Sequence, residues 1–248
     1  MNKSNRFTRR DFVKGAASAA VAASMIVPRT VFGYADKLPP SERITLGFIG
    51  VGIMNRGHLG GFLGNGEVQV LAVCDVDTTR REHAQKMVED RYAKDKESGK
   101  FKGCEAYTDF RQLIARKDIN AVVIAAPDHW HTHPVVEACK AGKDIYCEKP
   151  LTLTIAEAKV MIDAVRKYNR VFQTGSQQRS DREFRVACEA VRNGRIGKIK
   201  TVYAAVGGPS RPCDLPEEPM EEGLDWNFCI SATRVGSCRP GVASFPRL

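Results

Sequence analysis

The sequence predicts an α/β fold with a doubly wound parallel sheet, followed by the beginning of a smaller α+β domain. Three observations support this. Short apolar runs alternate with charged or amphipathic stretches over residues 43–174, a glycine-rich turn follows the first run, and one later run is apolar throughout, as in strands buried on both faces. Ligands of such sheets bind beyond the carboxyl ends of the strands. The residues that follow each strand are therefore the first candidates for a site.

The composition indicates an ordered globular chain that is no nucleic-acid binder. Of the 248 residues, 43% are hydrophobic and 27% are charged. The formal net charge of +9 is concentrated at the two ends, with +5 in residues 1–33 and +3 in residues 229–248. The intervening residues carry only one excess positive charge, too little for an electrostatic footprint on DNA or RNA.

The N-terminal residues resemble a twin-arginine signal peptide. The sequence Thr-Arg-Arg-Asp-Phe-Val-Lys at 8–14 precedes a mildly apolar, alanine-rich run at 15–27, and Gly33 or Ala35 offers a small residue for cleavage. A stable membrane span needs about 20 apolar residues, so none is expected here. We therefore predict a signal peptide over residues 1–33, the twin-arginine translocase as partner, and a periplasmic or otherwise exported location. A basic amphipathic surface helix is the alternative.

The first apolar run, residues 44–49, is a predicted strand that leads through a glycine loop into a helix over 58–63. This order is that of the dinucleotide-binding fingerprint of the Rossmann fold. Its first glycine permits a tight turn and its second lets the backbone approach a pyrophosphate at the helix N-terminus. Gly50 and Gly52 occupy these two positions.

The loop departs from the fingerprint at its third glycine position. Asn55 stands where glycine or alanine is usual, so either the helix packs more loosely against the strand or Gly57 takes this role. Ile53 and Met54, which follow Gly52, are included among the predicted cofactor-binding residues.

A second predicted strand, residues 68–74, ends in Asp75, about 20 residues beyond the glycine loop. A carboxylate at this place accepts hydrogen bonds from the adenosine ribose and repels a 2′-phosphate, which favours NAD over NADP. Arg80 and Arg81 follow closely and are expected to soften this preference. A helix N-cap is the structural alternative for Asp75.

The remaining elements of the first domain alternate in the same manner. We expect helices over 78–94, 109–116, 132–141 and 154–168, and strands over 121–125, 145–147 and 171–174.

Two polar segments follow neighbouring strands of this predicted sheet. Residues 126–133 contain Pro127, Asp128 and three histidines, of which His131 is the strongest candidate for the site. His129 and His133 are expected to be surface-loop or helix-capping residues. No carboxylate or thiolate partner stands at ligand spacing, so no metal is predicted.

The second segment is Glu148-Lys149-Pro150. Following an apolar strand, and preceded by Pro127-Asp128-x-x-His131 and the glycine loop, it resembles the Gfo/Idh/MocA family. The resemblance implies an NAD(P)-dependent oxidoreductase that acts on a sugar, a cyclitol or a related polyol. It also implies that Lys149 lies beside the nicotinamide as the catalytic residue, where a neighbouring positive charge lowers a lysine pKa. Pro127, Asp128, His131 and Glu148 are assigned to cofactor binding.

The resemblance continues into a second domain, predicted over residues 175–228. A segment containing Gln177 and Arg179 is expected to face the crevice, with Gln177 among the cofactor-binding residues. A helix through residues 184–185 and a strand over 200–206 should follow. The family resemblance also implies a homo-oligomer formed through an open antiparallel sheet.

Residues 229–248 depart from the family pattern. They contain no acidic residue and no amphipathic period, and we interpret them as a frameshifted or substituted tail. No histidine follows His133, so the DxxxH-like pair that assists the lysine is absent. We therefore expect a truncated substrate domain, and two other functions stay open. One is a truncated, inactive dinucleotide-binding protein, and the other is a glycoside hydrolase that retains NAD.

The eight cysteines are interpreted as buried free thiols rather than as a disulfide framework. Cys74, Cys139, Cys147 and Cys188 fall in predicted strands or helices without clustered spacing, and no CxxC sequence is present.

Overall fold

The computed structural model describes residues 42–208 and 219–230. The predicted signal peptide and residues 231–248 of the predicted tail lie outside these ranges.

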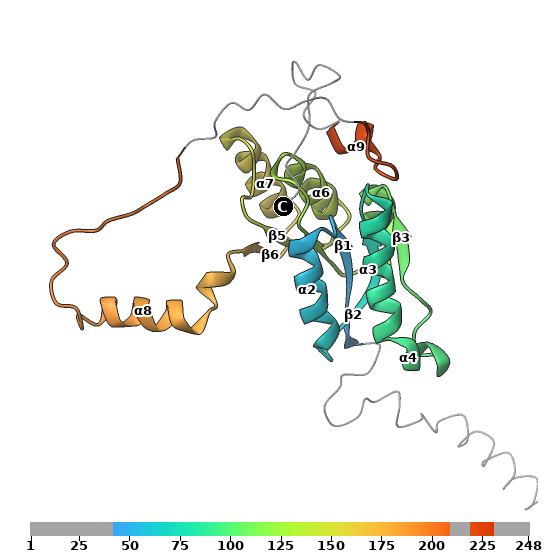
Figure 1. Cartoon of the computed structure of the whole chain (residues 1–248), viewed down its shortest axis with the longest axis horizontal. Helices are drawn as coiled ribbons and strands as arrows, with labels where there is room; N and C mark the ends of the chain where they lie inside the picture. The colour runs from blue at the N-terminus through green and yellow to red at the C-terminus, as the bar shows by residue number, and fades with distance from the viewer. Residues whose placement is uncertain (1–41, 209–218, 231–248) are drawn as a thin grey trace, which may run out of the picture. The chain divides into compact units, whose positions relative to one another are not determined.

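The described elements alternate between strand and helix over most of the chain (Figure 1). They are β1 (Ile44–Ile49), α2 (Ile53–Gly64), β2 (Val68–Cys74), α3 (Thr78–Arg91), α4 (Ala93–Glu97), β3 (Glu105–Tyr107), α5 (Phe110–Ala115), β4 (Ala121–Ile124), α6 (Asp128–Lys140), β5 (Asp144–Glu148), α7 (Ile155–Lys167), β6 (Phe172–Gly175), the short 3-10 helix η3 (Gln177–Arg179), α8 (Arg182–Arg192) and α9 (Trp226–Ile230).

The strands form one sheet in the order β3-β2-β1-β4-β5-β6, and every neighbouring pair is parallel. The chain runs outward from β1 to β3, returns to β4 beside β1, and then runs outward to β6. The predicted doubly wound sheet is confirmed, and its point of reversal lies between β1 and β4, where such sheets bind their ligands.

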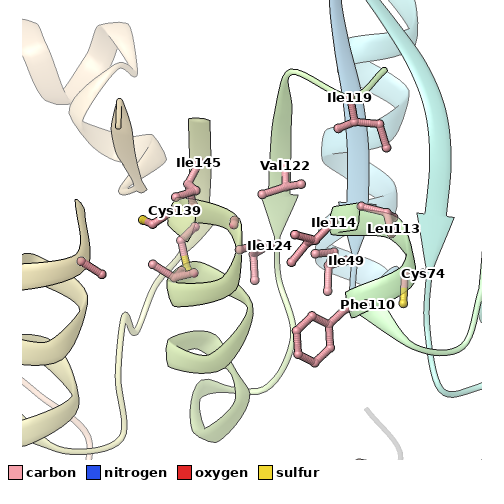
Figure 2. Packing of buried hydrophobic residues seen from close by; sticks show 14 of the residues in the cluster. Ile49, Cys74, Phe110, Leu113, Ile114, Ile119, Val122, Ile124, Cys139 and Ile145 are labelled. Atoms are coloured by element: carbon pink, nitrogen blue, oxygen red, sulfur yellow. The ribbon is translucent and has the colours of Figure 1, made fainter. Parts of the chain in front are cut away.

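Two apolar clusters cover the two faces of the sheet. One contains residues of α2 and α3 with β1 and β2, including Leu59 and Val88. The other joins α5, α6 and α7 to the sheet and includes Leu113, Val122 and Cys139 (Figure 2). Both faces of the central strands are buried, which explains why the run 121–124 is entirely apolar.

Two helices begin earlier than predicted. α2 begins at Ile53 rather than residue 58, with Gly52 as its N-cap. α6 begins at Asp128 rather than residue 132, after Pro127 in an extended conformation. A carboxylate in the first turn favours a helix N-terminus, so Asp128 belongs to the helix rather than to a loop.

The predicted strand over 200–206 is wrong. These residues are exposed and have no regular structure, because no partner strand within the described ranges completes their backbone hydrogen bonds. Sequence reasoning also missed β3, whose three residues are too few to show a period. The free-thiol interpretation is confirmed for Cys74, Cys139 and Cys147, which are buried, whereas Cys188 is exposed on α8.

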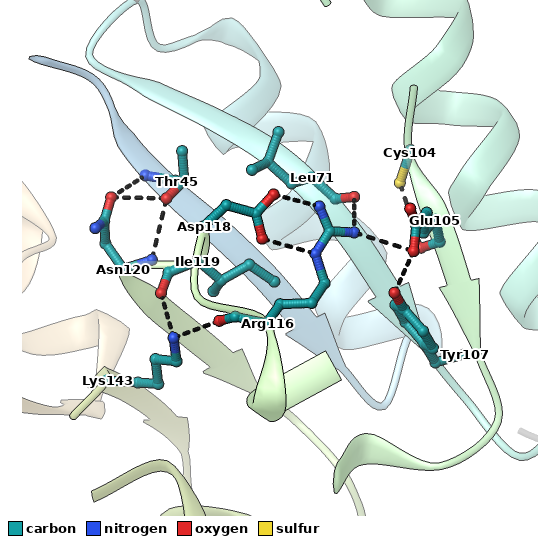
Figure 3. Close-up of polar contacts among 10 residues, drawn as sticks. All are labelled: Thr45, Leu71, Cys104, Glu105, Tyr107, Arg116, Asp118, Ile119, Asn120 and Lys143. Carbon is teal, nitrogen blue, oxygen red and sulfur yellow. Dashed lines mark hydrogen bonds and ion pairs between the residues drawn. The ribbon is translucent and has the colours of Figure 1, made fainter. Parts of the chain in front are cut away.

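A polar network holds the amino-terminal edge of the sheet (Figure 3). The Nζ of Lys143, a buried residue, donates to the carbonyl oxygens of Arg116 at 2.5 Å and Ile119 at 2.7 Å. The Arg116 guanidinium pairs in turn with both carboxylate oxygens of Asp118, at 2.9 and 2.6 Å. Burial lowers the pKa of Lys143. This lysine therefore joins the α6–β5 turn to the segment that precedes β4.

Substituting Lys143→Met should lower the free energy of unfolding by about 1–3 kcal/mol, because two carbonyl groups lose their donor while the methylene stem is kept. Urea denaturation measures the change. Lys140→Met is the matched control, since Lys140 is exposed and its ion pair is with Glu137 of its own helix. If both substitutions lowered the free energy of unfolding equally, the stabilising role of the Lys143 hydrogen bonds would be contradicted.

Candidate functional site

The turn after β1 requires glycine at its first position. Gly50 has a φ of 74°, and a Cβ placed on it would lie 2.7 Å from the backbone nitrogen of Ala126. Its own N–H donates to the carbonyl of Cys74 at 2.9 Å. The turn is therefore pressed against the residues that follow β4 and leaves no space for a side chain.

The N-terminus of α2 is open. Its first turn contains no acidic residue, and among the residues that the structure describes, no side chain caps it and none would lie within 4 Å of a Cβ on Gly52. Ile53 and Met54 are 71% and 43% exposed. A helix of 12 residues thus directs its positive end toward free space, which suits a phosphate group.

Asn55 does not loosen the loop, contrary to the first of our two expectations. Its side chain is fully buried, and Nδ2 donates to the carbonyls of Gly50 at 2.8 Å and Ile49 at 3.2 Å. Gly57 is exposed, and a Cβ placed on it would meet nothing within 4 Å, so it does not replace the third glycine either. The Asn55 amide instead ties the helix to the strand that precedes it.

Asp75 lies beside the glycine loop. Its Oδ2 accepts from the Val51 N–H at 2.7 Å and its Oδ1 from the Asp77 N–H at 2.9 Å. Burial raises the pKa of Asp75, and these two backbone N–H groups oppose the rise. A carboxylate has about four acceptor positions, so it can also accept a hydrogen bond from a ligand hydroxyl.

The two arginines beyond Asp75 already have partners. The Arg80 Nε lies 3.0 Å from Oδ2 of Asp77. The Arg81 guanidinium donates to the carbonyl of Asp75 at 2.8 Å and to the Thr78 hydroxyl at 3.1 Å. Asp77, the N-cap of α3, was missed by sequence reasoning, although an aspartate directly before a predicted helix is a recognisable N-cap signal.

Glu148 is buried at the end of β5. Its Oε1 lies 2.7 Å from Nε2 of His58, and its Oε2 accepts from the Lys149 N–H at 3.0 Å. A Cβ on Gly175 would lie 2.7 Å from the carboxylate, so β6 closes over it. His58 was not predicted as a site residue, because nothing in the sequence relates α2 to a carboxylate 90 residues away.

Lys149 is exposed at the same edge of the sheet. His131 is 1% exposed, and its Nδ1 donates to the carbonyl of Pro150 at 2.8 Å. Its contact is therefore with the backbone of the loop that carries Lys149, and its Nε2 has no protein partner within the described ranges.

The other predicted cofactor-binding residues follow parallel strands as expected. Pro127 and Asp128 stand at the start of α6 after β4, and Gln177 is exposed in η3 after β6. In the described part of the chain, no group of three or more histidines, cysteines or acidic residues is arranged to hold a metal ion. None of the helices described there is long and apolar enough to cross a membrane.

These features fit a dinucleotide. The carboxyl edge of the sheet combines an uncapped helix N-terminus beside open space, a buried carboxylate at the end of β2, and a lysine at the end of β5. Gly50 brings the glycine loop against the β4–α6 connection at the reversal point, and the ends of β2 and β5 lie one strand further out on either side.

Solved structures of inositol dehydrogenases resemble this chain. Myo-inositol 2-dehydrogenase from Lactobacillus plantarum matches with a TM-score of 0.55 and 28% identity, over 63% of this chain and 43% of that one. Scyllo-inositol dehydrogenase from Lactobacillus casei, with bound NAD(H) and scyllo-inositol, matches with a TM-score of 0.54 and 25% identity, over 62% of this chain and 42% of that one.

Curated relatives give a consistent result. Myo-inositol 2-dehydrogenase of Thermotoga maritima is 35% identical over 108 residues, which are 44% of this chain and 32% of that protein. Glycosyl hydrolase family 109 protein 2 of Shewanella sp. (strain ANA-3) is 31% identical over 207 residues, 78% of this chain and 44% of that protein. The chain thus spans less than half the length of these relatives.

The Gfo/Idh/MocA family model, described as an oxidoreductase family with an NAD-binding Rossmann fold, matches residues 44–176. The match includes β1 to β6, the glycine loop, Asp75 and Lys149. With more than half of its residues matched, the chain belongs to the Gfo/Idh/MocA oxidoreductase family.

Proposed function

We propose that this protein uses NAD to remove hydride from a carbinol carbon of a cyclitol, sugar or similar polyol, or in reverse to deliver it to the corresponding carbonyl carbon. One observation carries the proposal. The open N-terminus of α2, the Asp75 carboxylate and the loop of Lys149 meet at the carboxyl edge of one sheet. The resemblance to inositol dehydrogenases supports the substrate class.

The two ends of the site hold the two halves of the dinucleotide. Gly50, Gly52 and the backbone of Ile53 and Met54 form the pyrophosphate position, and Asp75 accepts from the adenosine ribose. Bound NAD supplies the hydride acceptor at the other end.

Lys149 accepts the hydroxyl proton of the substrate at the nicotinamide end of the site. When a carbinol carbon loses hydride, its hydroxyl proton must pass to a nearby base, and we assign this role to the side chain of Lys149, which is exposed. Glu148 and His131 hold the loop on both sides of this lysine, through the Lys149 N–H and the Pro150 carbonyl. They act as positioning residues, and Gln177, exposed in η3, is assigned to cofactor binding.

The environment of Asp75 supports NAD over NADP. A 2′-phosphate would meet the carboxylate, and both nearby arginines are engaged, Arg80 by Asp77 and Arg81 by the Asp75 carbonyl. These partners offset part of the positive charge that a 2′-phosphate would need, which supports the preference for NAD.

A glycoside hydrolase that retains NAD is the second candidate. The Shewanella relative supports it, because that match extends over 78% of this chain, further than the inositol dehydrogenase of Thermotoga. In that reaction NAD is reduced and then reoxidised in each cycle, whereas an oxidoreductase accumulates NADH.

We also propose export through the twin-arginine translocase to the periplasm and assembly as a homo-oligomer. The arginine pair within residues 8–14 supports export, and many exposed apolar side chains of the described ranges, among them Phe184 and Tyr203, support burial against another surface. Light scattering of the purified protein tests the assembly, and a monomeric mass would refute it.

Gly50→Ala and Gly52→Ala should separate folding from binding. The first strains the backbone and collides with Ala126, so it should lower the thermal midpoint markedly. The second leaves the fold intact but fills the free space at α2, so NAD affinity should fall about tenfold or more. Calorimetric titration and thermal unfolding measure both effects. A Gly52→Ala variant with unchanged affinity would refute the pyrophosphate assignment.

Asp75→Asn should remove the preference for NAD over NADP in the same titration. Burial raises the pKa of Asp75, so the carboxylate gains its proton at a higher pH than a solvated aspartate does. As the pH is lowered, the NAD affinity of the unchanged protein should therefore begin to fall at a higher pH than a solvated aspartate would cause. The affinity of the variant should not show this fall. A pH dependence shared by both proteins would count against Asp75 as the ribose acceptor.

Lys149→Ala should lower turnover by about 10²–10⁴-fold while NAD affinity stays nearly the same. NADH absorbance is followed with a panel of inositols and sugars, and an aryl glycoside is tested beside them. Lys159→Ala, an exposed lysine of α7, is the control. Glycoside cleavage without net NADH would favour the hydrolase, and a fully active Lys149→Ala would exclude the proposed proton transfer.

Replacing Arg9 and Arg10 together by lysine should leave the precursor in the cytoplasm, because the translocase recognises the arginine pair. Cell fractionation with antibody detection measures the distribution. Lys3→Arg is the charge-preserving control, and export that continues without the pair would exclude this route.

A further inference from the structure

Residues 223–229, the docked segment, contact the connection between β2 and α3 although they lie almost 150 residues further along the chain. The carbonyl of Gly223 accepts from the Thr78 N–H at 3.0 Å, and the Asp225 N–H donates to the carbonyl of Val76 at 3.0 Å. Leu224 forms an antiparallel bridge with Asp77. Residues 76–78, which directly follow Asp75, are thus each paired with a residue of the docked segment.

The other end of the docked segment contacts the beginning of α6. The carbonyl of Cys229 accepts from Nε1 of Trp130 at 2.7 Å and from Nε2 of His129 at 3.3 Å. The Phe228 ring packs against Trp130 with a centroid distance of 5.2 Å and against Phe110 at 6.2 Å. These neighbours follow β4 and β3, so the segment extends across the carboxyl edge of the sheet.

The docked segment also lies beside Asp75, because it is hydrogen-bonded to Val76, the next residue along the chain. Burial raises the pKa of the Cys229 thiol, and the negative charge of Asp75 adds to the rise. In a Rossmann sheet, the carboxylate after the second strand binds the adenosine ribose. The surroundings of Asp75 are therefore the surroundings of the adenosine half of the cofactor.

We propose that residues 223–229 form an outer wall of the adenosine half of the NAD site. This rests on the proposed function, since it needs NAD at the glycine loop. Such a wall has two effects on cofactor binding. Its hydrogen bonds to Val76 and Thr78 order the connection next to Asp75 before the cofactor binds. The end of the docked segment that contains Cys229 reduces the access of water to the ribose and adenine.

Cysteine alkylation tests the position of the wall. Cys229 is half-buried and Cys188 is exposed on α8, so the same sample contains a probe and an internal reference. With N-ethylmaleimide and peptide mass spectrometry, ADP-ribose and NAD should slow labelling of Cys229 about tenfold. Nicotinamide mononucleotide should not, and Cys188 should react equally in all samples. Binding of NAD without protection of Cys229 would overturn the proposal.

An affinity measurement tests the same wall independently. Phe228→Ala should weaken ADP-ribose about tenfold and leave nicotinamide mononucleotide unaffected, because only the adenosine half touches the docked segment. Phe172→Ala removes an equal, partly buried ring from edge strand β6 and should leave ADP-ribose affinity unchanged.

The outcomes separate the two proposals. If the unchanged protein binds no NAD, the proposed function fails and the wall fails with it. If it binds NAD and ADP-ribose, but Phe228→Ala binds ADP-ribose equally well, only the wall is refuted. Equal losses in Phe228→Ala and Phe172→Ala would also refute it, since they would indicate general destabilisation.

Discussion

The contact between Gly50 and the backbone after β4 is the constraint on which the rest of the site depends. Because no side chain separates them, the turn after β1 and the beginning of α6 meet at the reversal point of the sheet. From this contact, α2 extends with its N-terminus toward free space, and Asp75 reaches back to the Val51 N–H. Asn55 then fixes the helix to the carbonyls of the same turn. The geometry of binding is thus set by backbone packing before any ligand is present.

Much of this arrangement could be predicted because it is local in sequence. A fully apolar run such as 121–124 indicates a buried parallel strand, and the glycine spacing predicts the tight turn between β1 and α2. The starts of α2 and α6 were predicted too late, because their N-cap residues are Gly52 and Pro127. Neither residue has a side chain that caps a helix, so the sequence shows no N-cap signal at these positions.

What could not be predicted depends on contacts between distant segments. The pairing of His58 with Glu148 joins residues 90 positions apart, and neither residue type indicates the other. The docked segment meets Val76 and Thr78 mainly through backbone atoms, which leave no trace in side-chain pattern. The strand predicted over 200–206 failed for a related reason. Residue types that favour β-structure do not form a strand unless a partner strand is present.

The pairing of Arg80 with Asp77 and of Arg81 with the Asp75 carbonyl bears on how this site can change over evolutionary time. Where arginines without partners follow the carboxylate that binds the ribose, replacing that carboxylate alone is enough to let the site bind NADP. Here both arginines already have partners, so under the proposed function the loss of Asp75 alone would remove repulsion without adding a new positive charge. A change of cofactor would then be easier if Asp77, the partner of Arg80, were replaced as well.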